Sequence, residues 1–135
     1  MSTLPAQSGM PKLREYFSLE EYGARLAKVR AEMAARGLDL LIISDPSNLA
    51  WVSGYDGYSF YNHQCVLVSM DQEPIWYGRA LDLNGARATT WMQHDQLAGY
   101  PEEYVQRGLH PRVHFAREVM AARGWSQHQI GRAHV

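Results

Sequence analysis

The chain has 135 residues, which is enough for one domain with a buried core. Its 13 Lys and Arg against 14 Asp and Glu give a net charge of −1, which argues against a nucleic-acid-binding surface. The single cysteine, Cys65, excludes an intrachain disulfide and favours a reducing compartment. No apolar run approaches the roughly 20 residues of a membrane span, and the N-terminus has no apolar signal segment. We therefore expect a soluble cytoplasmic domain that binds neither nucleic acid nor membrane.

The first half of the sequence predicts a helix, a strand and a second, short helix. Ser18 followed by Glu21 forms a capping box, and apolar residues then recur at helical spacing. Gly37 is typical of the position just after a helix. The aliphatic run at 38–43 predicts a strand that is covered on both faces. Residues 47–54 predict a short helix that stops at its terminal glycine.

The second half predicts two strands followed by helices. Residues 65–69 and 75–78 predict strands joined by a tight turn, and residues 79–92 predict a helix. Residues 95–108 are typical of a loop. A last helix is expected from Pro111 to Gly124. This alternation predicts an α/β domain whose mixed sheet is flanked by helices.

Several of these segments together resemble a known family. An amphipathic helix containing Arg-x-x-Met (residues 30–33) is followed by "GLDLLII" and "NLAWVSG", and then by "CVLV" and "EPIWYGRALDLNGARATTW". This order is similar to the N-terminal domain of the creatinase/prolidase family, which includes Xaa-Pro aminopeptidases, creatinase and ectoine hydrolase. The resemblance covers residues 15–125, and it is greatest to the ectoine hydrolase branch.

The resemblance implies a ribonuclease H-like α/β domain, incomplete at its C-terminus, that precedes a pita-bread catalytic domain absent from this chain. In the family that catalytic domain usually holds a pair of divalent metals, such as Mn²⁺ or Co²⁺, which activate water to hydrolyse C–N bonds. A cytoplasmic homodimer is implied, with each N-terminal domain covering its partner's active site. The substrate would be a small molecule such as ectoine, opened to an N-acetyl-diaminobutyrate, with Xaa-Pro peptides or creatine as alternatives. No catalytic residue, metal ligand or cofactor site is therefore expected in this chain.

The same resemblance divides the chain into three parts. Residues 1–14 are expected to form a flexible N-terminal segment, and residues 15–129 form the domain itself. The family continues from residue 130 with Ile-Gly-Val-Glu, whereas this chain reads Ile-Gly-Arg-Ala-His-Val. Codons for that ending match a common sequencing-adapter stretch, so we expect residues 130–135 to be a truncated or artefactual tail. The domain would then lack a late strand and leave a sheet edge unpaired.

An aromatic loop follows Gly54 and contains Tyr55, Tyr58, Phe60 and Tyr61. In one interpretation the rings pack over the sheet, and Trp51 just before them is buried. In the other, the loop lies at the strand ends and helps to form a binding site. In the family a Phe and an Arg of this loop contact substrate across the dimer, and their positions match Phe60 and Asn62. Asn62 lacks the charge of an arginine, which His63 would have to supply.

The remaining candidates have simpler interpretations. His110 and His114 have the i, i+4 spacing of two metal ligands, but a third ligand is not evident, so surface histidines are expected. Cys65 begins an apolar strand and is expected in the core. Glu102 and Glu103 are expected to be solvated. Two classes of function stay open, the accessory domain of an enzyme and a stand-alone binding module.

Overall fold

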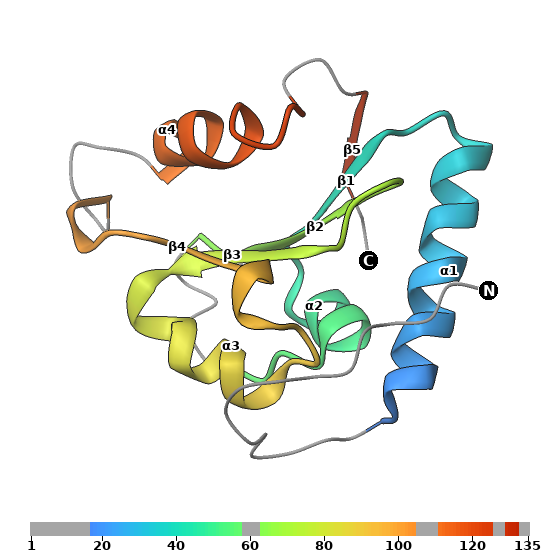
Figure 1. The fold of residues 1–135 in the computed structure, drawn as a ribbon, viewed down its shortest axis with the longest axis horizontal. Helices are drawn as coiled ribbons and strands as arrows, with labels where there is room; N and C mark the ends of the chain where they lie inside the picture. The colour runs from blue at the N-terminus through green and yellow to red at the C-terminus, as the bar shows by residue number, and fades with distance from the viewer. Residues whose placement is uncertain (1–16, 58–62, 105–110, 126–128, 133–135) are drawn as a thin grey trace.

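The computed structural model describes residues 17–57, 63–104, 111–125 and 129–132, and these form a three-layered α/β domain (Figure 1). Its five-stranded sheet has the order β4-β3-β2-β1-β5. The strands are β1 (Leu40–Ile43), β2 (Cys65–Ser69), β3 (Ile75–Arg79), β4 (Leu97–Tyr100) and β5 (Ile130–Arg132). β2 pairs antiparallel with β1 and β3, whereas β4 and β5 pair parallel with β3 and β1. The predicted α/β class with a mixed sheet is therefore confirmed.

Helix α1 (Leu19–Ala35) begins and ends as the sequence predicts. The Ser18 hydroxyl accepts a hydrogen bond from the backbone N–H of Glu21 at 3.1 Å, which satisfies one of the free N–H groups of the first turn. Gly37 has φ +68°, a left-handed conformation that suits a residue without a Cβ. The Glu21 carboxylate does not complete the capping box. It pairs with Arg25 one turn further along the helix.

Helix α2 (Pro46–Ser53) is short and is fixed at both ends. The Asp45 carboxylate accepts a hydrogen bond from the N–H of Asn48, and Gly54 ends the helix with φ +81°. Leu49 and Val52, three residues apart, face the core with no measurable exposure. Trp51 lies between them in sequence and points elsewhere, so that 42% of it is exposed. The prediction that Trp51 is buried is wrong, because helical spacing gives the core side to its two neighbours.

Helices cover both faces of the sheet (Figure 1). Helices α1, α2 and α3 (Leu83–Thr89) lie on one face, around a core that includes Leu26, Val52 and Trp76. Helix α4 (Pro111–His114), continued by a π-helical segment at Phe115–Met120, lies over the other face. That second core is formed by buried residues of the sheet and of the last helical segment, namely Leu40, Cys65, Leu67, Ile75, Tyr77, Tyr100, Val119, Met120 and Trp125.

Two strands lie where the sequence predicts none. β4 falls within the segment 95–108, whose "LAGY" composition is typical of a loop, and it forms because β3 provides a parallel partner. β5 falls in the predicted tail at 130–135 and extends the sheet beside β1. The backbones of Asp39 and Gln129 begin that pairing, with the Asp39 N–H donating to the Gln129 carbonyl at 2.8 Å. The edge of β1, which was expected to be unpaired, is therefore paired at residues 130–132. The division of the chain at residue 129 stays a prediction.

Candidate functional site at the carboxyl edge of the sheet

The aromatic loop ends at the edge of the sheet where four strands also end. β1, β3, β4 and β5 run in the same direction, so their carboxyl ends share one edge, and the antiparallel β2 begins there. The loop follows the end of α2, and its last described residues, His63 and Gln64, lead into β2 at this edge. In α/β sheets, ligands bind in crevices outside the carboxyl ends of the strands. The end of the loop therefore lies at the strand ends, and a role of the loop in binding stays a prediction.

The structure places only part of the predicted substrate-contacting set. Phe60 and Asn62 lie outside the described residues, as do Tyr58 and Tyr61. His63 is described, and its side chain is exposed at the start of β2. Its backbone carbonyl accepts a hydrogen bond from the Tyr100 hydroxyl at 2.7 Å, which ties the end of the loop to the end of β4.

The first part of the loop is packed. Tyr55 is 5% exposed, and its ring lies 5.2 Å from that of Trp76, centroid to centroid. The backbone N–H of Asp56 donates to the Thr89 hydroxyl at 3.2 Å, which joins the loop to the end of α3. The packing interpretation is therefore right for Tyr55. Burial raises the pKa of its phenol well above the usual value, with the Asp82 carboxylate adding to the effect.

An ion pair at the same edge was not expected from the sequence. Arg79, the last residue of β3, donates from Nε and Nη2 to the two carboxylate oxygens of Glu102, at 2.7 and 2.9 Å. Such a bidentate pair is geometrically specific. Arg79 lies opposite Tyr100 in the register of β3 and β4. Glu102 is thus not merely solvated, and only the parallel pairing of these strands brings it to an arginine 23 positions away.

On the face of the sheet that α4 covers, His114 contacts the buried Tyr77. The Tyr77 hydroxyl donates to the Pro111 carbonyl at 3.1 Å and lies 3.0 Å from His114 Nδ1. The tautomer of the His114 imidazole decides which of the two groups donates in this second contact. His114 is therefore half-buried rather than a free surface histidine, while His110 lies outside the described residues. Cys65 lies in this core as predicted, and burial raises the pKa of its thiol to about 12.

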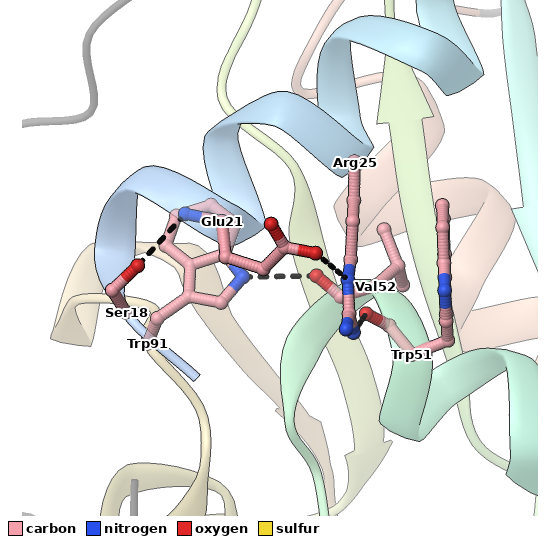
Figure 2. A network of polar contacts seen from close by, with 6 residues as sticks. All are labelled: Ser18, Glu21, Arg25, Trp51, Val52 and Trp91. Carbon is pink, nitrogen blue, oxygen red and sulfur yellow. Dashed lines mark hydrogen bonds and ion pairs between the residues drawn. The ribbon is translucent and has the colours of Figure 1, made fainter. Parts of the chain in front are cut away.

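A concave surface adjoins the loop between α1 and α2. A pocket of about 400 Å³ is lined by residues of both helices and by Gly54, Tyr55 and Asp56 at the start of the loop. Arg25 of α1 extends along this surface beside Trp51 of α2 (Figure 2). Its Nε donates to Glu21 Oε1 at 3.2 Å, and its Nη1 donates to the Trp51 carbonyl at 2.7 Å. Sequence spacing predicted neither the pocket nor the position of this arginine.

Within residues 17–57, 63–104, 111–125 and 129–132, no group of three or more His, Cys, Asp or Glu side chains gathers in a way that would hold a metal ion. The metal pair that the family resemblance implies therefore does not fit the described residues of this chain. None of the helices in the same residues combines the length and the apolar character needed to cross a membrane.

The described residues thus form an α/β domain with a mixed five-stranded sheet. A family model for the creatinase/prolidase N-terminal domain matches residues 25–123. The chain belongs to this family, as the sequence resemblance predicted.

Two curated relatives match most of the chain but only part of their own length. Ectoine hydrolase of Halomonas elongata is 53% identical over 116 residues, which is 85% of this chain and 29% of that protein. A protein of Sinorhizobium fredii named as an uncharacterized hydrolase/peptidase (y4tM) is 38% identical over 91 residues, which is 67% of this chain and 23% of the relative. The chain thus spans less than a third of the length of either relative.

Solved structures share the fold at low sequence identity. A dipeptidase from Pyrococcus horikoshii superposes with a TM-score of 0.60 and 20% identity, over 80% of this chain and 27% of that chain. An Xaa-Pro aminopeptidase from Streptococcus pyogenes gives a TM-score of 0.60 and 15% identity, over 84% and 74% of the two chains. At these identities the likeness establishes the fold alone.

Proposed function

We propose that this chain is the N-terminal accessory domain of a hydrolase that acts on C–N bonds, and that the substrate of the full-length enzyme is ectoine. The observation that carries this proposal is the 53% identity to ectoine hydrolase over 116 residues. In the proposed reaction, water adds to the amidine carbon of ectoine and a ring C–N bond breaks. The product is an N-acetyl-diaminobutyrate with a free amine.

The domain would act by covering an active site rather than by supplying its chemistry. We propose a cytoplasmic homodimer in which the loop after α2 reaches the partner's catalytic domain, with Phe60, Asn62 and His63 near the substrate. The end of the loop at His63, which the Tyr100 hydroxyl fixes at the carboxyl edge of the sheet, supports this role. The divalent metal pair, such as Mn²⁺ or Co²⁺, would be held by the catalytic domain.

The test is to recover the full-length gene and assay its product for ring opening of ectoine, with an amine-reactive dye that detects the new primary amine. Reactions with added Mn²⁺ and with a chelator define metal dependence. Parallel reactions with an Xaa-Pro dipeptide, followed by the release of free proline, define the substrate class. The 135-residue chain serves as the control, and we expect it to be inactive alone. Hydrolysis of the dipeptide but not of ectoine would refute the proposed substrate. Turnover by the 135-residue chain above a mock preparation would refute the accessory role.

A further inference from the structure

Arg25 lies inside a cage of aromatic rings. Its guanidinium carbon lies 4.1 Å from the ring centroid of Phe17, 5.1 Å from that of Trp51 and 5.5 Å from that of Tyr22. Rings at this distance stabilise a cation above their faces. The arginine is thereby held in one orientation, because its neighbours come from α1, from α2 and from Phe17, two residues before α1.

The donors of this arginine are only partly used. The Arg25 side chain is 10% exposed, and its two hydrogen bonds employ Nε and Nη1. A guanidinium has five N–H donors, so within the described part of the chain Nη2 remains open to another acceptor. Glu21, the charged partner of Arg25, is half-exposed and 3.2 Å away, so solvent weakens this pairing. A largely buried cation with unused donors favours a further anionic partner.

A space suited to such a partner adjoins the arginine. The pocket of about 400 Å³ is within the range of small-molecule sites, and aromatic side chains form much of its lining. The exposed faces of Phe17 (48%) and Trp51 (42%) belong to this lining. Large exposed rings beside an arginine are typical of binding sites.

We propose that this pocket, the α1–α2 pocket, binds a small organic carboxylate carried on a flat apolar body. The carboxylate would accept hydrogen bonds from the Nη groups of Arg25, and the body would lie against Trp51. The cage itself does not select a cationic ligand, because Arg25 already occupies the place between the rings. Asp56, which also lines the pocket, is an acidic residue and disfavours a second negative charge on the ligand. The carboxylate belongs either to a free acid or to the C-terminus of a peptide chain.

The test titrates the 135-residue chain with benzoate and follows the tryptophan indole signals by NMR. Trp51 is the reporter, since it is 42% exposed while Trp76, Trp91 and Trp125 are 5% exposed or less. The indole signal that is missing from the spectrum of Trp51→Leu is thereby assigned to Trp51. We expect a saturable shift of the Trp51 signal with a dissociation constant of about 1 mM or tighter. Benzamide, which has the same ring without the charge, should bind at least about tenfold more weakly.

Two arginines of α1 provide a matched pair of variants. Arg25→Lys keeps the charge but loses the planar fork, and it should weaken benzoate binding at least about tenfold. Arg36→Lys should leave binding unchanged, because Arg36 has the same i, i+4 pairing, to Glu32 at 2.8 Å, but does not line the pocket. The buried Trp91 indole signal checks that each variant is folded. Trp51→Leu, monitored by the NMR relaxation of benzoate itself, should weaken binding at least about fivefold through lost ring contact.

Several results would overturn the proposal. One is equal binding of benzamide and benzoate. Another is a dissociation constant for benzoate that changes less than about twofold in both Arg25→Lys and Trp51→Leu. The third is the absence of a saturable shift up to about 20 mM benzoate. Once benzoate binding is established, N-acetylphenylalanine and its amide distinguish the source of the carboxylate. Tighter binding of the free acid of this pair than of benzoate indicates a peptide C-terminus, and weaker binding indicates a free small acid.

Discussion

The indole Nε1 of Trp91 donates a hydrogen bond to the backbone carbonyl of Val52 at 2.9 Å, which joins the segment after α3 to helix α2 (Figure 2). Both residues are buried, and the backbone N–H of Trp91 also donates to the carbonyl of Ser53 at 3.2 Å. Trp91 thus donates to two successive backbone carbonyls in the last turn of α2. This attachment fixes the point from which the aromatic loop leaves the helix.

Trp91→Phe should destabilise the fold substantially. The substitution removes the indole donor and leaves the buried Val52 carbonyl with one partner fewer, while the smaller ring also leaves space. We expect a loss of about 2–4 kcal/mol in the free energy of unfolding, measured by urea denaturation. The matched control, Trp51→Phe, changes the exposed tryptophan of α2 and should cost less than about 1 kcal/mol. Equal losses in the two variants would contradict the assignment of these residues to core and surface.

Cys65 should be unreactive in the folded chain. Because its pKa is raised to about 12 by burial, almost none of it is thiolate at pH 8, and the thiolate is the nucleophile. A chromogenic disulfide reagent at pH 8 should therefore label the native chain only as fast as it unfolds. In denaturant the same thiol should react within the mixing time. Immediate stoichiometric labelling of the native chain would show that the start of β2 is open.

The free energy of unfolding should fall in alkaline solution. Burial, aided by the Asp82 carboxylate, raises the pKa of Tyr100 to about 12, whereas the unfolded chain has the ordinary value near 10. Between these values the folded chain holds a proton that the unfolded chain has released. The stabilisation is complete below pH 10 and is lost as the pH rises toward 12, by at most about 1.4 kcal/mol per pH unit for this residue.

Urea unfolding midpoints measured from pH 9 to 11.5 test this slope, with Tyr100→Phe as the comparison. The variant loses the hydrogen bond to His63 and starts from a lower stability, but its decline with pH should be shallower. Parallel curves for the two proteins would assign the alkaline loss to other groups, such as Cys65 and Tyr77, whose pKa values are also raised.

Phe60→Ala, made in the full-length enzyme, should damage substrate handling more than folding. If the loop reaches a partner's active site, kcat/KM should fall at least about tenfold, which corresponds to ~1.4 kcal/mol of transition-state stabilisation. The melting temperature should stay near that of the parent enzyme. Leu81→Ala is the matched control, since Leu81 is 66% exposed just after β3 at the same edge. Normal kinetics per folded molecule would make Phe60 a packing residue only.

The elements that the sequence predicts well are those whose signals are local. Ser18, Gly37 and Gly54 set the ends of α1 and α2 through contacts within a few residues, and all three behave as the sequence predicts. β4 and β5 are different, because each becomes a strand only by pairing with a neighbour distant in sequence. Composition around Ala98 and Gly99 carries no strand signal of its own.

The candidate site also combines features that the sequence predicts with features that it does not predict. The sequence predicts that the aromatic loop lies at a strand end, and its last described residues, His63 and Gln64, lie there before β2. The pairing of Arg79 with Glu102 and the cage around Arg25 arise from parallel strands and from two packed helices, so no motif in the sequence marks them. Residue type alone does not predict the exposure of Trp51. Its large ring is exposed because helical spacing turns it away from the core, although its neighbours Leu49 and Val52 are buried.

Gly54 limits how the loop can vary by mutation. A Cβ at this position would lie 2.7 Å from the Tyr22 hydroxyl and 3.0 Å from the Thr89 carbonyl, and φ +81° is strained for any residue with a side chain. Parts of α1 and α3 thus close over the end of α2 from two directions. A change at codon 54 strains the backbone and displaces Tyr22, so selection on the chemistry of the loop acts more readily on the positions after it. A mutant library aimed at substrate preference should leave this codon fixed and randomise the positions beyond it.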